Sequence, residues 1–204
     1  MDTEQVTLQL LHKLYPTDDD IAPTDTNFPR WIEEDDTFAP FIPTSITRVI
    51  KALRMAECTP SDIVLDLGCG DGRICAAASA LFGVTRAVGV ECDPLVISQA
   101  RNSWHTLCKT LSTIDAETVQ FLEQDFRNVE MDPVRGWLQQ VTVLVVFLSP
   151  EFALVFRDTL VRLFERGVTI VAICFNLDEV SGLTVKHGLD PRGDDDIWVY
   201  QKRT

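Results

Sequence analysis

The spacing of hydrophobic and polar residues changes near residue 60. Before that point, apolar residues recur every three or four positions in residues 3–14 and again in residues 46–53, which predicts two amphipathic helices. The hydroxyl of Thr44 or Ser45 could cap the second helix. Between the two helices, prolines recur among acidic residues from 15 to 43, and we predict an extended segment anchored by aromatic side chains.

After residue 60, short apolar runs alternate with longer helical patterns. The runs predict strands at 62–67, 87–91, 118–122, 141–148 and 168–174, and helices at 73–82, 94–108 and 133–140. One further helix is expected between Ser149 and Gly167, with a core face listed here: Phe152, Val155, Phe156, Leu160 and Leu163. Two last strands, at 183–186 and 197–201, have no helix between them and should pair antiparallel.

These elements predict an α/β protein with a three-layer, Rossmann-like fold. Its sheet should have seven strands, mostly parallel, with an antiparallel hairpin at the C-terminus. We divide the chain into residues 1–43, an N-terminal helix followed by an acidic, proline-rich lid segment, and residues 44–204, the main domain.

A glycine-rich loop follows the first predicted strand and opens a helix, in the run I-V-L-D-L-G-C-G-D-G-R of residues 63–73. Glycines at 68, 70 and 72 allow the backbone to approach a ligand closely. Glu91 ends the second strand, 25 residues after Asp66, where an acid can bind both ribose hydroxyls of an adenosine. Asp125 follows the third strand and would flank the adenine. The pattern therefore predicts an adenosine cofactor.

The loop favours S-adenosylmethionine (SAM) over NAD or ATP. The dinucleotide pattern G-x-G-x-x-G requires a third glycine where this chain has Arg73, and the phosphate loop G-x-x-x-x-G-K-[ST] is absent from the sequence. Asp66 and Asp71 would also place negative charge beside a pyrophosphate. Carboxylates at these positions suit the α-ammonium of a methionyl group instead.

The motifs D-L-G-C-G-D-G-R (66–73), V-G-V-E-C-D-P (88–94) and Q-D-F (124–126) resemble those of class I, seven-strand SAM-dependent methyltransferases, over roughly residues 38–204. A narrower resemblance comes from P-F-I-P-T (40–44) and the P-E pair at 150–151. They are similar to a group that contains the lysine methyltransferases of the ATP synthase c subunit and the adenine nucleotide translocase. The resemblance implies methylation of a protein lysine. Ser149 stands where many relatives have a large apolar residue, so the acceptor pocket need not match theirs.

The loop and the resemblance together define a set of candidate site residues. The predicted cofactor-binding residues are Phe41, Thr44, Asp66, Gly68, Cys69, Gly70, Glu91, Cys92, Asp125 and Phe126. The predicted acceptor-lining residues are Trp31, Asp36, Pro43 and Ser149, and Glu151 is the candidate catalytic residue. Ser-Pro-Glu at 149–151 is equally a good helix start. We expect no metal, since the three histidines are far apart in the chain.

The charge of the chain indicates which partners it attracts. The formal net charge is −13, and residues 1–40 contribute −8 of it. Such a field repels phosphate backbones and attracts basic segments, so we expect a basic protein or peptide as partner and no nucleic acid. The acids could equally be only a solubilising loop.

Membrane and targeting signals are missing from the sequence. Without an apolar span, a secretory signal or a C-x-x-C pair among the six cysteines, we expect a cytoplasmic protein, with a nuclear location also open. Two other functions stay open: methylation of a small cationic molecule, and a SAM-binding partner subunit without activity. The sequence leaves the oligomeric state undetermined.

Overall fold

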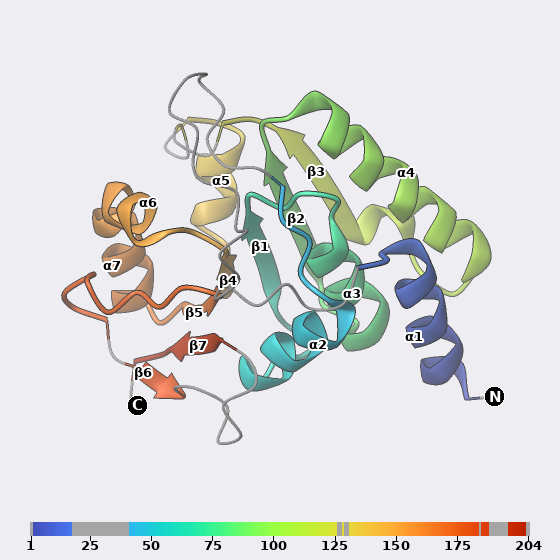
Figure 1. Ribbon diagram of the computed structural model, residues 1–204, viewed down its shortest axis with the longest axis horizontal. Helices are drawn as coiled ribbons and strands as arrows, with labels where there is room; N and C mark the ends of the chain where they lie inside the picture. The colour runs from blue at the N-terminus through green and yellow to red at the C-terminus, as the bar shows by residue number, and fades with distance from the viewer. Residues whose placement is uncertain are drawn as a thin grey trace.

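A computed structural model describes residues 2–17, 41–125, 128, 131–183, 185–187 and 196–202. Trp31, Asp36 and Phe126, which the sequence analysis assigned to the site, lie outside these residues. The described residues form three layers, with a central sheet between two groups of helices (Figure 1). The predicted α/β architecture is confirmed.

The sheet has seven strands in the order β3-β2-β1-β4-β5-β7-β6. Its strands are β1 (Ile63–Leu67), β2 (Arg86–Glu91), β3 (Val119–Glu123), β4 (Val143–Val146), β5 (Thr169–Ile173), β6 (Val185–His187) and β7 (Ile197–Tyr200). The first five pair in parallel, whereas β7 pairs antiparallel with both β5 and β6. The predicted C-terminal hairpin is therefore present.

Helices α1 (Thr3–Leu14), α2 (Ile46–Met55), α3 (Arg73–Phe82) and α4 (Pro94–Thr110) share one hydrophobic cluster with the sheet residues Val64 and Ala87. Helices α5 (Val134–Leu138), α6 (Pro150–Val155) and α7 (Arg157–Glu165) share a second cluster with Leu65 and Val88. Adjacent strand residues thus face opposite layers, as the alternation of side chains along a strand requires. Most residues of β1, β2, β4 and β5 are buried and apolar for this reason, and Asp66 of β1 is a buried exception.

The N-terminal helix α1 belongs to the main hydrophobic core. Leu11 and Tyr15 are buried in the cluster that also contains α2, α3 and α4. Asp2 caps α1 by accepting a hydrogen bond from the backbone N–H of Glu4. Leu11 and Tyr15, from the part of the chain that we set apart from the main domain, therefore belong to its core.

Two of the predicted helix starts agree closely with the structure. The Ser45 side chain caps α2 by accepting from the Arg48 N–H at 3.2 Å. Asp93 caps α4 by accepting from the N–H groups of Leu95 and Val96, with Pro94 in the first turn. These caps set where each helix leaves the loops at the carboxyl end of the sheet.

The single helix predicted after Ser149 is wrong. The chain forms α6 and α7, separated at Phe156, whose backbone leaves the helical region. The predicted core face contained Val155, which is 68% exposed, while Ala153 and Phe156 are buried. The buried stripe passes through Ala153, Phe156, Leu160 and Leu163, and the break lets both short helices face the sheet. Ser149 takes the N-cap position of α6 but makes no side-chain capping bond there.

Candidate functional site

The site lies where the strand order reverses, between β1 and β4. β1 continues to β2 and β3 on one side and to β4 and β5 on the other. Open α/β sheets bind ligands outside the carboxyl ends of the strands at such a switch point. In the sheet register Asp66 stands opposite Gly89, two residues before Glu91, and Glu91 stands opposite Glu123, two residues before Asp125. The three predicted site acids therefore lie at the carboxyl ends of adjacent strands.

The glycine loop connects β1 to α3 in a conformation that requires glycine. The φ angles of Gly68, Gly70 and Gly72 are 79°, 54° and 80°, all in the left-handed region. The Gly72 N–H donates to the Cys69 carbonyl at 2.9 Å, and the Gly68 and Cys69 N–H groups both donate to Val90 of β2. The loop is therefore a tight turn fixed against the end of the neighbouring strand.

The Glu91 carboxylate organises the second side of the site. It accepts hydrogen bonds from the N–H groups of Gly70 at 3.1 Å, Cys92 at 2.7 Å and Asp93 at 2.9 Å. Burial, Glu91 and, more weakly, Asp125 raise the pKa of the Cys92 thiol to about 11, so this thiol is protonated at neutral pH. Glu91, Cys92 and Asp125 are thus neighbours, as their predicted common role requires.

Asp66 is the most unusual group of the site. Its side chain is only 2% exposed, and its Oδ2 atom has no hydrogen-bond partner among the described residues. Burial raises the pKa of this carboxyl to about 8, with further contributions from the charges of Glu91 and Asp71. A buried oxygen without a donor suits a ligand that brings one, and an ammonium group is such a ligand.

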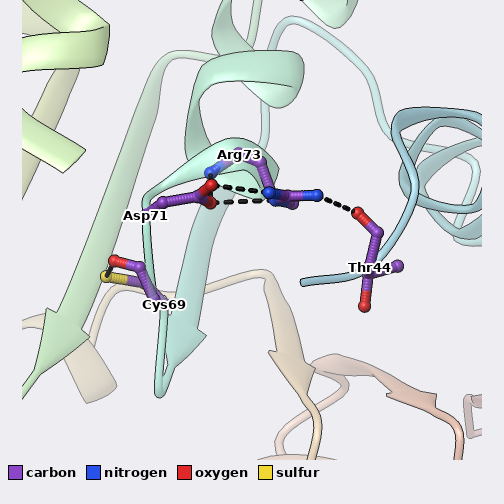
Figure 2. A network of polar contacts seen from close by, with 5 residues as sticks. Thr44, Cys69, Asp71 and Arg73 are labelled. Carbon is purple, nitrogen blue, oxygen red and sulfur yellow. Dashed lines mark hydrogen bonds and ion pairs between the residues drawn. The ribbon is translucent and has the colours of Figure 1, made fainter. Parts of the chain in front are cut away.

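Asp71 forms a buried ion pair with Arg73, the first residue of α3 (Figure 2). Arg73 donates from Nε to Asp71 Oδ1 at 2.9 Å and from Nη2 to Oδ2 at 2.6 Å. It also donates from Nη1 to the Thr44 carbonyl at 2.5 Å. The charge of Asp71 is therefore balanced locally, and Asp66 and Glu91 are the predicted site acids that a cationic ligand would meet.

Two aromatic rings lie close to the Arg73 guanidinium. Its central carbon is 5.8 Å from the ring centroid of Tyr15 and 5.9 Å from that of Phe41. A Cβ atom placed on Gly70 would come within 2.2 Å of the Phe41 ring. The ring, 41% exposed, therefore packs directly on the glycine loop.

Only some of the residues predicted to line the acceptor site belong to the described part of the chain. Pro43 is exposed beside Phe41, and Ser149 is buried at the end of β4. Glu151 lies in the first turn of α6, but its side chain is outside the described part, as are Trp31 and Asp36 entirely. Their roles, including that of Glu151 in catalysis, stay predictions.

Sequence reasoning missed three residues that shape the loop. Arg73 was considered only as a missing glycine, and Tyr15 only as the start of an irregular segment. Gly89 was overlooked: a Cβ there would lie 2.7 Å from the Cys69 sulfur and 2.9 Å from the Phe121 ring, so only glycine lets the loop seat against β2. Glycine in the middle of the apolar run A-V-G-V was the available signal.

Comparison with known proteins gives this site a family. Residues 66–183, from the last part of β1 to beyond β5, match the family model described as the ANTKMT methyltransferase domain. The chain belongs to the ANTKMT methyltransferase family. The resemblance to class I methyltransferases predicted from the glycine loop is therefore confirmed.

Two individual relatives are also methyltransferases. A curated "Protein-lysine N-methyltransferase" from Saccharolobus islandicus (strain REY15A) is 46% identical over 61 residues. The match spans 30% of this chain and 38% of the relative's length. The chain also resembles an RNA methyltransferase from Salinibacter ruber, solved in complex with S-adenosyl-L-homocysteine. Identity is 27% and the TM-score 0.64, over 78% of this chain and 93% of that one.

A more distant structure shares the fold alone. TrmN from Thermus thermophilus is 18% identical with a TM-score of 0.57, over 78% of this chain and 49% of that chain. The described residues of this chain also bear on metal binding and on membrane spans. Across these residues, no three or more His, Cys, Asp and Glu side chains gather as a metal site would need. In that same part of the chain, no helix is long and apolar enough to cross a membrane.

Proposed function

We propose that the chain is a SAM-dependent protein-lysine N-methyltransferase whose substrate is a basic protein or peptide. The observation that carries the cofactor assignment is the buried Oδ2 of Asp66, which has no partner among the described residues and lies beside the glycine loop and Glu91. The 46% identity to a protein-lysine N-methyltransferase over 61 residues supports the acceptor. The acidic charge of the chain supports a basic partner.

The residues present fit SAM. Asp66 would accept a hydrogen bond from the α-ammonium of the methionyl group, and Glu91 would bind the ribose hydroxyls. We assign Cys92 and Asp125 to the adenine side because they lie near Glu91. We assign Phe41 and Thr44 to the methionyl side because they contact Gly70 and Arg73. SAM supplies a methyl group activated by its sulfonium, and the protein's part is to position two reactants and exclude water.

A lysine acceptor must be neutral to attack the methyl group, because an ammonium nitrogen has no lone pair. Ser149 and Glu151 follow β4 at the carboxyl end of the sheet, where an acceptor would enter. We propose that Glu151 acts on the lysine ammonium there, either by orienting it or by taking up its proton. The acids of residues 33–36 would attract the basic substrate from outside.

RNA is the second candidate acceptor, because the relative from Salinibacter ruber is described as an RNA methyltransferase. The charge of this chain opposes it. A net charge of −13 repels a phosphate backbone, and RNA-binding surfaces are usually basic.

In the decisive experiment, the purified protein is incubated with methyl-labelled SAM and an extract of cells that lack the protein. We expect label in one protein, recovered after hydrolysis as methyl-lysine. Label in RNA would overturn the proposed acceptor, and label in a small cationic molecule would favour that alternative. Binding of S-adenosylhomocysteine without any labelled product would indicate a partner subunit without activity.

The cofactor is tested separately by calorimetry with S-adenosylhomocysteine and with NAD. We expect the first to bind and the second not to bind. Glu91→Ala should weaken binding by roughly 1–3 kcal/mol, the usual scale for hydrogen bonds to a charged group. Unchanged affinity would remove Glu91 from the site. A cytosolic location also belongs to this proposal and is tested by imaging the tagged protein.

A further inference from the structure

Arg73 contacts three parts of the chain that are far apart in the sequence. Its guanidinium lies between the glycine loop, the segment 41–44 and the end of α1, and it is only 4% exposed. Among the described residues, no backbone–backbone hydrogen bond joins 41–44 to residues 68–72. The contacts of the Arg73 side chain are therefore the polar link between them.

We propose that Arg73 is a positioning residue for the methyl-donor site: it holds residues 41–44 against the glycine loop and so fixes the Phe41 ring over Gly70. This inference rests on the proposed cofactor site. It adds a residue that would touch neither SAM nor the acceptor and would act through the segment it holds.

The geometry is specific to arginine. Two donors of the guanidinium fork bind the two Asp71 oxygens, and a third binds the Thr44 carbonyl in a different direction. A lysine ammonium is a point charge on a flexible stem and cannot reproduce a planar fork with a third bond beyond it. The link to Thr44 therefore depends on arginine, while the charge balance with Asp71 does not.

The link also explains how an exposed segment adopts one position. Phe41 is 41% exposed and Pro43 is exposed, so burial of their own side chains fixes this stretch only partly. Thr44 precedes the Ser45 cap of α2, and its carbonyl is held at 2.5 Å by Arg73. Because the Phe41 ring rests on Gly70 and lies 5.9 Å from Arg73, one side chain sets both ends of the segment.

The first test is Arg73→Lys, which keeps the charge. We expect the variant to fold and to bind S-adenosylhomocysteine roughly tenfold more weakly, a change of about 1.4 kcal/mol. In the protein without cofactor, the backbone amides of Arg48 and Val49, which donate to Ser45 at the start of α2, should exchange hydrogen faster than in the wild type. The matched control is Arg166→Lys, since Arg166 also donates to a backbone carbonyl, that of Val141, but on the other side of the sheet.

A second variant removes the hydrogen bonds of Arg73 without leaving the carboxylate of Asp71 buried and unpaired. Asp71→Asn with Arg73→Gln removes both charges of the pair and should show the same two effects. If either variant binds S-adenosylhomocysteine within twofold of the wild type, the positioning role is overturned. If the wild type itself binds none, the proposed function fails, while hydrogen exchange at Arg48 and Val49 still tests the link.

A double-mutant cycle separates positioning from general loss of stability. Phe41→Ala should weaken cofactor binding, and adding Arg73→Lys should weaken it little further, because Arg73 acts through the placement of Phe41. Fully additive losses would show that Arg73 acts independently of this segment and would overturn the proposal.

Discussion

Asp66 combines complete burial with an oxygen that has no partner among the described residues. Because burial raises the pKa of this carboxyl to about 8, it is mostly protonated at pH 7 before a cofactor binds. A cationic α-ammonium beside it would favour the ionised form and lower the pKa. Binding of S-adenosylhomocysteine should therefore release a proton from Asp66.

Calorimetry at pH 7 in two buffers of different ionisation enthalpy measures this release, which should approach one proton per bound ligand. Asp66→Asn should bind more weakly and release none. The same shift makes the folded protein bind more protons than the unfolded chain between the ordinary pKa of 3.8 and about 8. The contribution of Asp66 to the free energy of unfolding therefore falls as pH rises through that window. A wild-type binding enthalpy independent of buffer would contradict this assignment.

Tyr15 carries the second buried polar atom near the glycine loop. Its hydroxyl has no hydrogen-bond partner among the described residues, and burial raises its pKa above the ordinary value of 10.0. Tyr15→Phe removes the unpaired hydroxyl but keeps the ring beside Arg73. We expect an unchanged or slightly higher thermal midpoint, since the desolvation cost of an unpaired group disappears. Tyr15→Ala is the comparison, and it should cost about 3–5 kcal/mol of stability, as loss of a large buried ring does. A marked loss in Tyr15→Phe would reveal a partner for the hydroxyl.

At the scale of elements, the turn between β1 and α3 depends on backbone conformations and on clearance. Gly70 has a φ of 54° and the Phe41 ring above it, so Gly70→Ala adds both backbone strain and a collision at 2.2 Å. We expect this variant to displace Phe41 and to lose most of its affinity for S-adenosylhomocysteine.

Gly83→Ala provides the matched control at the other end of α3. Gly83 has a similar φ of 61°, but a Cβ there would meet nothing within 4 Å. It should therefore show only the backbone cost, about 1–2 kcal/mol, with cofactor affinity unchanged. Equal affinity losses in the two variants, measured by calorimetry, would show that strain alone matters and that Phe41 does not cover the loop.

At the scale of the whole molecule, the acidic N-terminal part is expected to select the substrate. Reversing the charges of residues 33–36 should lower kcat/KM for a basic peptide and weaken its dependence on salt, since long-range attraction is screened beyond about 8 Å at physiological ionic strength. Affinity for S-adenosylhomocysteine should stay nearly unchanged. If the variant methylates its substrate at the wild-type rate and with the same salt dependence, these acids only solubilise the protein.

Deleting residues 1–43 would be a poor test of the same idea. Leu11 and Tyr15 are buried in the cluster that joins α1 to α2, α3 and α4, so the deletion removes part of the core together with the acidic segment. Charge reversal leaves that core intact and is the cleaner measurement.

The sequence by itself determined the order of elements and the place of the cofactor loop. The apolar runs between residues 62 and 174 have the length of buried strands, and most are separated by a segment long enough to form a helix. A helix between two strands lets the chain cross back and pair them in parallel. Helix α3 begins and ends where the spacing indicated, because Gly72 and Gly83 adopt left-handed conformations that the sequence marks with glycine. Asp66 and Glu91 could be identified because Asp66 is the next-to-last residue of β1 and Glu91 the last residue of β2, and parallel strands end at one edge of the sheet.

The tertiary structure alone decided the contacts between segments distant in the chain. The break at Phe156 follows from which faces of α6 and α7 reach the sheet, and local spacing favours one helix there. The Arg73 fork joins Asp71, Thr44 and the ring of Tyr15 over sequence separations of 2, 29 and 58 residues. Hydrophobic periodicity carries no information about such pairs, because a buried arginine looks like an exposed one until the layer that covers it is in place.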